Sequence, residues 1–264
     1  MTDYSTSTID FDHKCNLHSV SGAWAALHKL FAGLPPTSVL DIGCGTGTWL
    51  RAALDLGVSE VYGIDGVPIE PDELLVPQQF FQVEDLTRRI DLGRKFDIVL
   101  CLELAEHLPA DAAPTLIDTL VTHSDLILFS AAAPYQQGQH HINCQWPSYW
   151  QDLFNMQGYV CDDSFRWQLW EIQAVEPWYR QNIFVARRAS VIAGQEPRIN
   201  SVIHPDMLRI KAFEVFERIE REVERRSVNK CIDEIETGSK SLSWYISLFS
   251  KTIATKVGRR LPRL

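Results

Sequence analysis

Five titratable side chains of types that transfer protons or bind metals lie in two short stretches of the chain. Glu103, Glu106 and His107 form a Glu-x-x-Glu-His pattern, and His140 and His141 follow in a later polar stretch. An imidazole can take a proton from a hydroxyl group at neutral pH. Carboxylates and imidazoles together also form a ligand set suited to a divalent cation. A structural interpretation is open as well, because acidic residues stabilise the start of a helix.

Residues 38–50 have the composition of a ligand-binding turn, in which a short apolar strand leads into Gly43, Gly45 and Gly47 and then into a helix. Glycines at this spacing allow positive φ and close approach of a ligand to the backbone. The free N–H groups of the helix start point outward. Asp41 lies two residues before the first glycine, where it would repel phosphate but attract a ligand with an ammonium group and a sulfonium.

This stretch resembles the first motif of the class I S-adenosylmethionine-dependent methyltransferases, which has the form apolar-apolar-acid-apolar-Gly-x-Gly-x-Gly. A second acid supports the resemblance, since Asp65 ends an apolar stretch 22 residues after Gly43. A dinucleotide-type fold places there a carboxylate that accepts hydrogen bonds from ribose hydroxyls. The alternatives are a tight turn without a ligand and a surface aspartate that opens a turn at Gly66.

The resemblance also implies contacts to the adenine of S-adenosylmethionine. An acid or amide after the third strand bonds to the adenine amino group in the family, and by position this is Asp85, with Leu86 packed on the ring. Solvated acids at a strand end are the alternative. The residues predicted to bind the cofactor are Asp41, Gly43, Cys44, Gly45, Gly47, Asp65, Gly66, Asp85, Leu86 and Glu103.

The Glu-x-x-Glu-His pattern resembles an element of the small-RNA 2′-O-methyltransferases and the ubiquinone-pathway O-methyltransferases. There it holds, with a later histidine, a metal that orients the substrate hydroxyl. The pattern also occurs in methyltransferases that need no metal. It implies Mg²⁺ or another divalent cation on Glu103, Glu106, His107 and His141. The catalytic candidates, with or without a metal, are Glu106, His107, His140 and His141.

The elements that must position these residues follow from hydrophobic periodicity. Strands are predicted at 39–42, 60–65, 78–86, 96–103, 125–132, 159–165 and 181–187, and helices at 20–31, 47–56, 112–122 and 148–158. The fold class is α/β. The resemblance implies a Rossmann-like, doubly wound sheet of seven strands in the order 3-2-1-4-5-7-6. Ligands bind such sheets at the carboxyl ends of the strands, where the motifs would then meet.

The composition changes near residue 190, which predicts a methyltransferase domain at 1–190 and a helical extension at 191–264. Apolar residues from Leu208 to Val223 repeat at helical spacing and indicate a long helix. This helix could dock on its own domain, pair with a second subunit in a homodimer, or cap a substrate. The aromatic and basic end of the chain is typical of a docked helix with a basic tail or of an interfacial membrane segment.

Composition excludes several classes of protein. The 264 residues are 45% hydrophobic and 22% charged, as in an ordinary globular chain. No apolar run is long enough to span a bilayer and the polar start is no signal peptide, so a cytoplasmic location is expected. Six scattered cysteines suggest neither a disulfide framework nor a zinc ribbon. Residues 1–250 carry a net charge of −14, which disfavours general nucleic-acid binding.

These observations predict an S-adenosylmethionine-dependent methyltransferase that acts on an oxygen atom of a small molecule or sugar. Two alternatives stay open. A metal-assisted RNA 2′-O-methyltransferase would explain the Glu-His cluster, although the acidic body argues against it. A non-catalytic cofactor-binding partner subunit, assembled through the C-terminal helix, would bind S-adenosylmethionine without turnover.

Overall fold

The computed structural model describes residues 11–13, 18–189 and 193–258, and the chain divides into two compact units, 1–207 and 208–264. The first unit continues past residue 190, where the sequence placed the domain boundary. Glu196 accepts a hydrogen bond from Asn155 at 2.6 Å, and His204 Nε2 lies 2.8 Å from the carbonyl oxygen of Trp170. These contacts hold the segment before residue 208 on the first unit.

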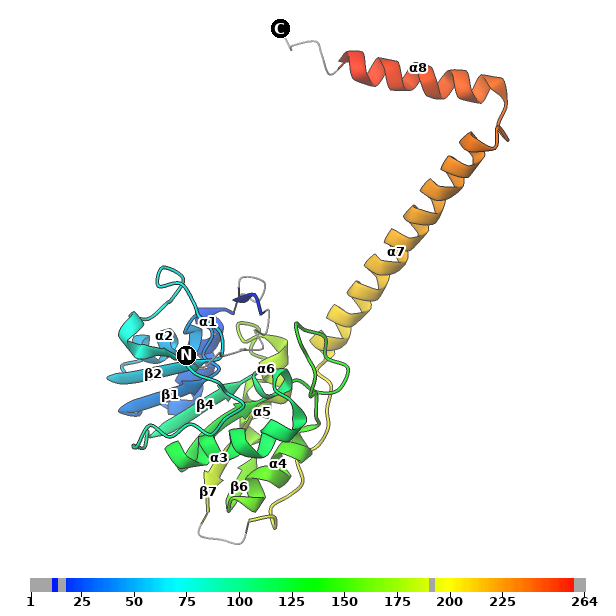
Figure 1. Cartoon of the computed structure of the whole chain (residues 1–264). Helices are drawn as coiled ribbons and strands as arrows, with labels where there is room; N and C mark the ends of the chain where they lie inside the picture. The colour runs from blue at the N-terminus through cyan, green and yellow to red at the C-terminus, as the bar shows by residue number, and fades with distance from the viewer. Residues whose placement is uncertain (1–10, 14–17, 190–192, 259–264) are drawn as a thin grey trace, which may run out of the picture. The chain divides into compact units, whose positions relative to one another are not determined.

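A seven-stranded sheet forms the centre of this unit (Figure 1). Its strands are β1 (Ser38–Ile42), β2 (Glu60–Asp65), β3 (Phe81–Val83), β4 (Ile98–Leu102), β5 (Leu126–Ser130), β6 (Tyr159–Asp162) and β7 (Phe184–Arg188). The order β3-β2-β1-β4-β5-β7-β6 confirms the predicted one, and β7 runs antiparallel to β5 and β6. Every residue of β1 and β4 is buried, as expected for central strands covered on both faces.

Helices cover both faces of the sheet (Figure 1). They are α1 (Val20–Phe31), α2 (Thr48–Asp55), α3 (Ala113–His123), α4 (Pro147–Met156), α5 (Ser164–Leu169) and α6 (Pro177–Asn182). Leu116 of α3 and Phe154 of α4 share one hydrophobic cluster with Phe129 of β5. A second cluster joins α1, α2, α5 and α6 to the other face, with Leu27 and Leu50 at its centre. The sheet therefore separates two hydrophobic layers.

Five of the seven strands are shorter than predicted, and local structure explains three of them, β3, β6 and β7. Residues 78–80 form a 3-10 turn before β3, and Glu84 leaves the sheet after donating its N–H to the carbonyl of Asp65. The strand predicted at 159–165 ends at Asp162, whose carboxylate accepts hydrogen bonds from the backbone and hydroxyl of Ser164 and turns the chain into α5. Residues 181 and 182 belong to α6 rather than to β7.

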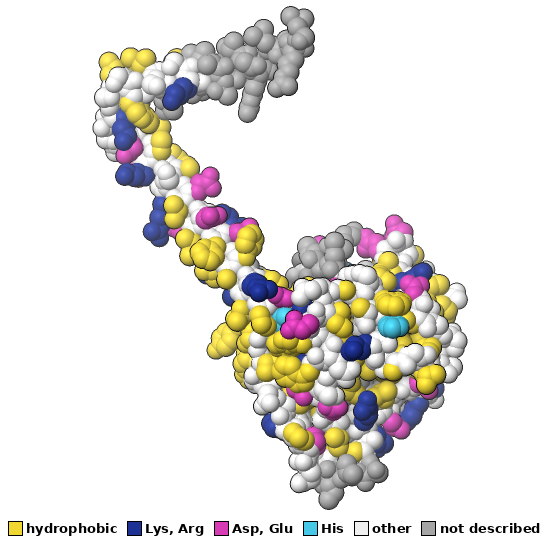
Figure 2. Space-filling model, turned by 180° about the vertical axis from the view of Figure 1, so that it is seen from behind, with side chains coloured by type: hydrophobic (Ala, Val, Ile, Leu, Met, Phe, Trp, Pro, Cys, Tyr) yellow, Lys and Arg dark blue, Asp and Glu magenta, His cyan; other side chains and the backbone are white. Residues whose placement is uncertain are grey.

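The long C-terminal helix predicted from the apolar repeat is α7 (Pro205–Glu236), and α8 (Leu242–Gly258) follows it. The apolar repeat along α7 is exposed, with Phe216 at 66% and Val223 at 61%, and Figure 2 shows hydrophobic side chains along this helix. None of the helices in the described residues combines the length and hydropathy needed to cross a membrane.

Candidate active site

The turn between β1 and α2 is built on positive backbone φ angles. Gly43, Gly45 and Gly47 have φ of 80°, 52° and 85°. A Cβ at Gly43 would lie 2.8 Å from a methyl carbon of Leu104, so the turn requires glycine for space as well as for conformation. Among the residues that the structure describes, no side chain caps the start of α2 at Gly47. The first backbone N–H groups of a helix have no partner within the helix, so a ligand can accept hydrogen bonds from them.

Asp65 ends β2 beside this turn and is 6% exposed. One carboxylate oxygen accepts a hydrogen bond from the N–H of Gly45 at 2.8 Å, and the other accepts one from Val67 at 3.0 Å. Two backbone N–H donors therefore hold the Asp65 carboxylate beside the glycine turn, as predicted for the acid at the end of the second strand.

Asp41 lies in β1 and is 2% exposed. Its Oδ2 atom has no hydrogen-bond partner among the described residues. Burial, followed by the negative charge of Asp65, raises the pKa of Asp41 to about 8. A carboxyl with such a pKa is neutral at pH 7 unless a cation binds beside it and stabilises the ionised form.

The remaining residues predicted to bind the cofactor lie around the ends of β2 and β3. Cys44 is buried, and Leu86 packs beside exposed Gly66, with its Cγ atom 3.7 Å from the place where a Cβ of Gly66 would lie. Asp85 is exposed, and its carboxylate accepts hydrogen bonds from the N–H and hydroxyl of Thr87. The hydroxyl of Thr87 is the main cause that lowers the pKa of Asp85.

A segment near the start of the chain, Phe11–His13, lies against the same site, although no motif in the sequence predicts a role for it. The N–H of Asp12 donates to Oε1 of Gln139 at 3.1 Å, and Nε2 of Gln139 donates back to the carbonyl of Asp12 at 3.0 Å. The rings of Phe11 and His107 are 5.0 Å apart. No periodicity marks this segment in the sequence, so only the structure reveals its place.

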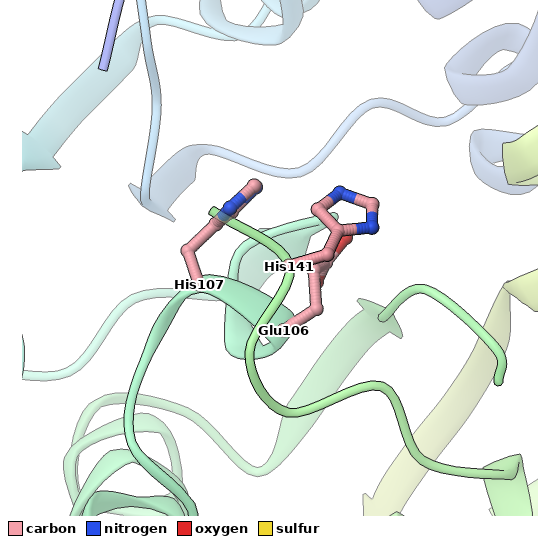
Figure 3. Close-up of side chains that lie close together, drawn as sticks. All are labelled: Glu106, His107 and His141. Carbon is pink, nitrogen blue, oxygen red and sulfur yellow. The ribbon is translucent and has the colours of Figure 1, made fainter. Parts of the chain in front are cut away.

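Glu106, His107 and His141 lie together at the carboxyl edge of the sheet (Figure 3). Glu106 and His107 belong to a 3-10 turn after β4, and His141 belongs to the loop after β5. One ligand atom from each side chain lies within 4.8 Å of the others. The two imidazole rings are 5.0 Å apart in an edge-to-face arrangement. His141 is oriented by its Nδ1 atom, 2.9 Å from the carbonyl oxygen of Gln136.

Glu106 is the carboxyl of this group. It is fully buried, and neither carboxyl oxygen has a hydrogen-bond partner among the residues that the structure describes. Burial and the neighbouring Glu103 raise its pKa well above the usual value. Burial, followed by the His141 ring, lowers the pKa of His107 to about 4. These shifts favour the uncharged form of both the Glu106 carboxyl and the His107 imidazole.

Glu103 and His140 stand outside this group. Glu103 has a φ of 51°, and its carboxylate accepts hydrogen bonds from Gln136 at 2.8 Å and from Asn182 at 3.0 Å. Burial raises the pKa of Glu103. His140 is exposed. The structure thus brings together three of the four residues predicted to bind a metal. The fourth, Glu103, is held by Gln136 and Asn182, which no sequence motif indicated.

The comparisons with known proteins agree with this architecture. A family model described as a methyltransferase domain matches residues 17–174. The chain is 31% identical over 122 residues to a ribosomal protein L11 methyltransferase from Pelobacter propionicus, over 42% of the chain and 38% of the relative. It is 32% identical over 114 residues to a magnesium-protoporphyrin O-methyltransferase from Synechocystis, over 40% of the chain and 48% of the relative. The chain spans less than half the length of these curated relatives.

Among solved structures, DesVI from Streptomyces venezuelae is 14% identical, with a TM-score of 0.48, over 64% of this chain and 92% of that chain. The family model covers more than half of the 264 residues. The chain therefore belongs to the methyltransferase domain family, and its membership of the class I S-adenosylmethionine-dependent methyltransferases is confirmed.

Proposed function

We propose that this protein transfers the methyl group of S-adenosylmethionine to an oxygen atom of a small molecule or sugar. The observation that carries the proposal is the group Glu106, His107 and His141, which lies at the same edge of the sheet as the glycine turn. Two curated relatives are named as O-methyltransferases, acting on magnesium-protoporphyrin and in ubiquinone biosynthesis. The third is named for ribosomal protein L11, so the names alone do not define the acceptor.

The cofactor fits the side chains around the glycine turn. Asp65 would accept the ribose hydroxyls, since its carboxylate is held beside the turn by Gly45 and Val67. Asp41 would pair with the ammonium group of the methionine part, which supplies the partner that its Oδ2 atom lacks among the described residues. Leu86 would pack on the adenine, with Asp85 near its amino group. The sulfonium of the bound cofactor supplies an activated methyl group.

The histidines would act on the acceptor. The acceptor oxygen forms a bond to the methyl carbon as the bond between sulfur and that carbon breaks, and the hydroxyl proton must leave the acceptor. Nδ1 of His141 faces the carbonyl oxygen of Gln136, and the ring lies beside His107, so Nε2 of His141 can take this proton. Burial raises the pKa of Glu106, and in its protonated form this carboxyl would donate a hydrogen bond that orients the acceptor.

A second candidate is a metal-assisted reaction. Both carboxyl oxygens of Glu106 and the Nδ1 atom of His107 are buried without hydrogen-bond partners among the described residues, and a divalent cation would satisfy them. Glu106, His107 and His141 would then hold Mg²⁺ or a similar ion. Such an ion lowers the pKa of a hydroxyl group that it binds.

Calorimetric titration with S-adenosylhomocysteine tests the cofactor site. We expect binding by the wild type, a loss of at least about tenfold in Asp65→Ala, and no change in a control, Asp91→Ala, which alters an exposed acid. Equal binding by all three proteins would refute the assignment of Asp65.

The acceptor is tested by transfer of a labelled methyl group to panels of phenols, sugars and RNA, with and without a chelator. Transfer of label to a phenol or sugar at the same rate with and without the chelator supports the first candidate. Chelator-sensitive transfer that Mg²⁺ restores, and that Glu106→Gln loses, supports the metal. Label that appears on RNA alone would overturn the small-molecule proposal. If cofactor binds but no acceptor is labelled, the protein is a cofactor-binding subunit without turnover.

A further inference from the structure

Helix α8 presents large apolar side chains to solvent along one face. Leu242, Ile246 and Phe249 are 75%, 61% and 70% exposed. Their spacing of four and three residues places them on the same side of the helix. Ser243 and Ser247 are also exposed and lie on a different side of the helix. We call Leu242, Ile246 and Phe249 the apolar face of α8.

The contacts of α8 with the end of α7 do not cover this face. The hydroxyl of Tyr245 donates to the carbonyl of Glu234 at 2.7 Å, and Lys240 pairs with the Glu234 carboxylate at 3.0 Å. Lys240 also lies 5.9 Å from the centre of the Trp244 ring. These contacts between α7 and α8 involve described side chains other than those of the apolar face.

The charge of this part of the chain is of one sign. After Glu236 the sequence has no acidic residue, and its basic residues are Lys240, Lys251, Lys256, Arg259, Arg260 and Arg263. The whole chain has a net charge of −9, so the positive charge is concentrated at this end. A helix with an exposed apolar face, aromatic residues and neighbouring positive charge has the chemistry of an interfacial helix on anionic lipid.

We propose that α8 binds in the plane of an anionic lipid bilayer, with its apolar face among the acyl chains and the basic residues near the headgroups. The helix lies on the membrane rather than across it, because no helix in the described part of the chain can span a bilayer. A second copy of the chain fits the face less well, since pairing α8 with itself would bring two groups of positive charges together. This proposal does not depend on the methyl acceptor.

Co-sedimentation of the full-length protein with vesicles tests it. We expect binding to phosphatidylcholine vesicles that contain phosphatidylglycerol, much weaker binding to phosphatidylcholine alone, and weakening by salt. Ile246→Ser and Phe249→Ser should each reduce binding about tenfold. A matched control, Ile219→Ser, removes an apolar side chain of α7 that is 53% exposed and should leave binding unchanged.

Two results would overturn the proposal. One is vesicle binding that both α8 substitutions leave intact or that all three substitutions reduce equally. The other is an absence of vesicle binding. If light scattering then shows a dimer that Phe249→Ser dissociates, the apolar face binds a second copy of the chain instead of lipid. Titration of the same variants with S-adenosylhomocysteine separates the two functions, since a folded variant keeps the wild-type affinity for cofactor whatever its affinity for lipid.

Discussion

The Nε2 atom of His13 lies 3.5 Å from Oδ1 of Asp65. This relationship brings a residue near the start of the chain to the carboxylate proposed to bind the ribose. The His13 ring is also 3.3 Å from the place where a Cβ of Gly45 would lie. Two hydrogen bonds between Asp12 and Gln139 hold the segment there. Phe11–His13 thus covers the glycine turn and reaches His107.

Replacing His13 by alanine should weaken cofactor binding. Nε2 of His13 is buried without a hydrogen-bond partner among the described residues, so it is available to a cofactor held on Asp65. A hydrogen bond to such a ligand contributes about 1–1.5 kcal/mol, and the dissociation constant of S-adenosylhomocysteine should rise about five- to tenfold. Calorimetry on His13→Ala and on a control, His28→Ala on exposed α1 surface, measures this. Tighter binding by His13→Ala would mean that His13 excludes the cofactor.

His141→Gln should slow methyl transfer about 10²- to 10⁴-fold without changing cofactor affinity, because it removes a positioned proton acceptor but no cofactor contact. The measurement uses whichever acceptor the label transfer identifies. His140→Gln is the matched control, since His140 is the neighbouring histidine but lies outside the group formed by Glu106, His107 and His141. Equal loss in both variants would remove His141 from the chemistry.

The parts of the site that the sequence predicted are those whose positions follow from local chain geometry. A strand that ends in Gly-x-Gly-x-Gly has to form the turn at Gly43–Gly47, and parallel strands bring Asp65 to the same edge. The strand order was also predicted correctly, but it came from the resemblance to the class I methyltransferases and not from local patterns.

Other parts of the site depend on loops that have no periodicity. Asn182 lies 79 residues from Glu103 in the chain and bonds to it only because α6 packs at the sheet edge. Gln136 and His13 are placed in the same way, by tertiary contacts between irregular segments. The length of β3 depends on where the chain leaves the sheet after Val83, which hydrophobicity alone does not show.

Gly43→Ala should destabilise the fold more than a change at another glycine with the same backbone angle. Gly43 and Gly33 have φ of 80° and 83°, so alanine at either position costs about 1–2 kcal/mol of backbone strain. A new Cβ at Gly43 would also meet Leu104, whereas no described atom lies within 4 Å of one at Gly33. Overpacking adds about 1–3 kcal/mol. Urea denaturation gives the loss in free energy of unfolding for each variant, and the difference between Gly43→Ala and Gly33→Ala is the cost of overpacking. Equal losses would show that Leu104 moves aside at no cost.

Asp41→Asn should raise the stability of the protein near pH 8 and weaken cofactor binding. Burial and Asp65 raise the pKa of Asp41 to about 8, from an ordinary 3.8. Between these values the folded protein keeps a proton that the unfolded chain has lost, so this group makes the free energy of unfolding fall as the pH rises through that range. Asparagine has the same shape and does not titrate.

Relative to the wild type, Asp41→Asn should therefore gain about 3.5 kcal/mol between pH 5 and pH 8 without cofactor, measured by urea denaturation at both values. The same variant should bind S-adenosylhomocysteine at least about tenfold more weakly, because an amide cannot pair with an ammonium group. A wild type and variant whose stabilities change in parallel with pH would show that Asp41 is already ionised in the folded protein. Unchanged affinity would assign the ammonium to another partner.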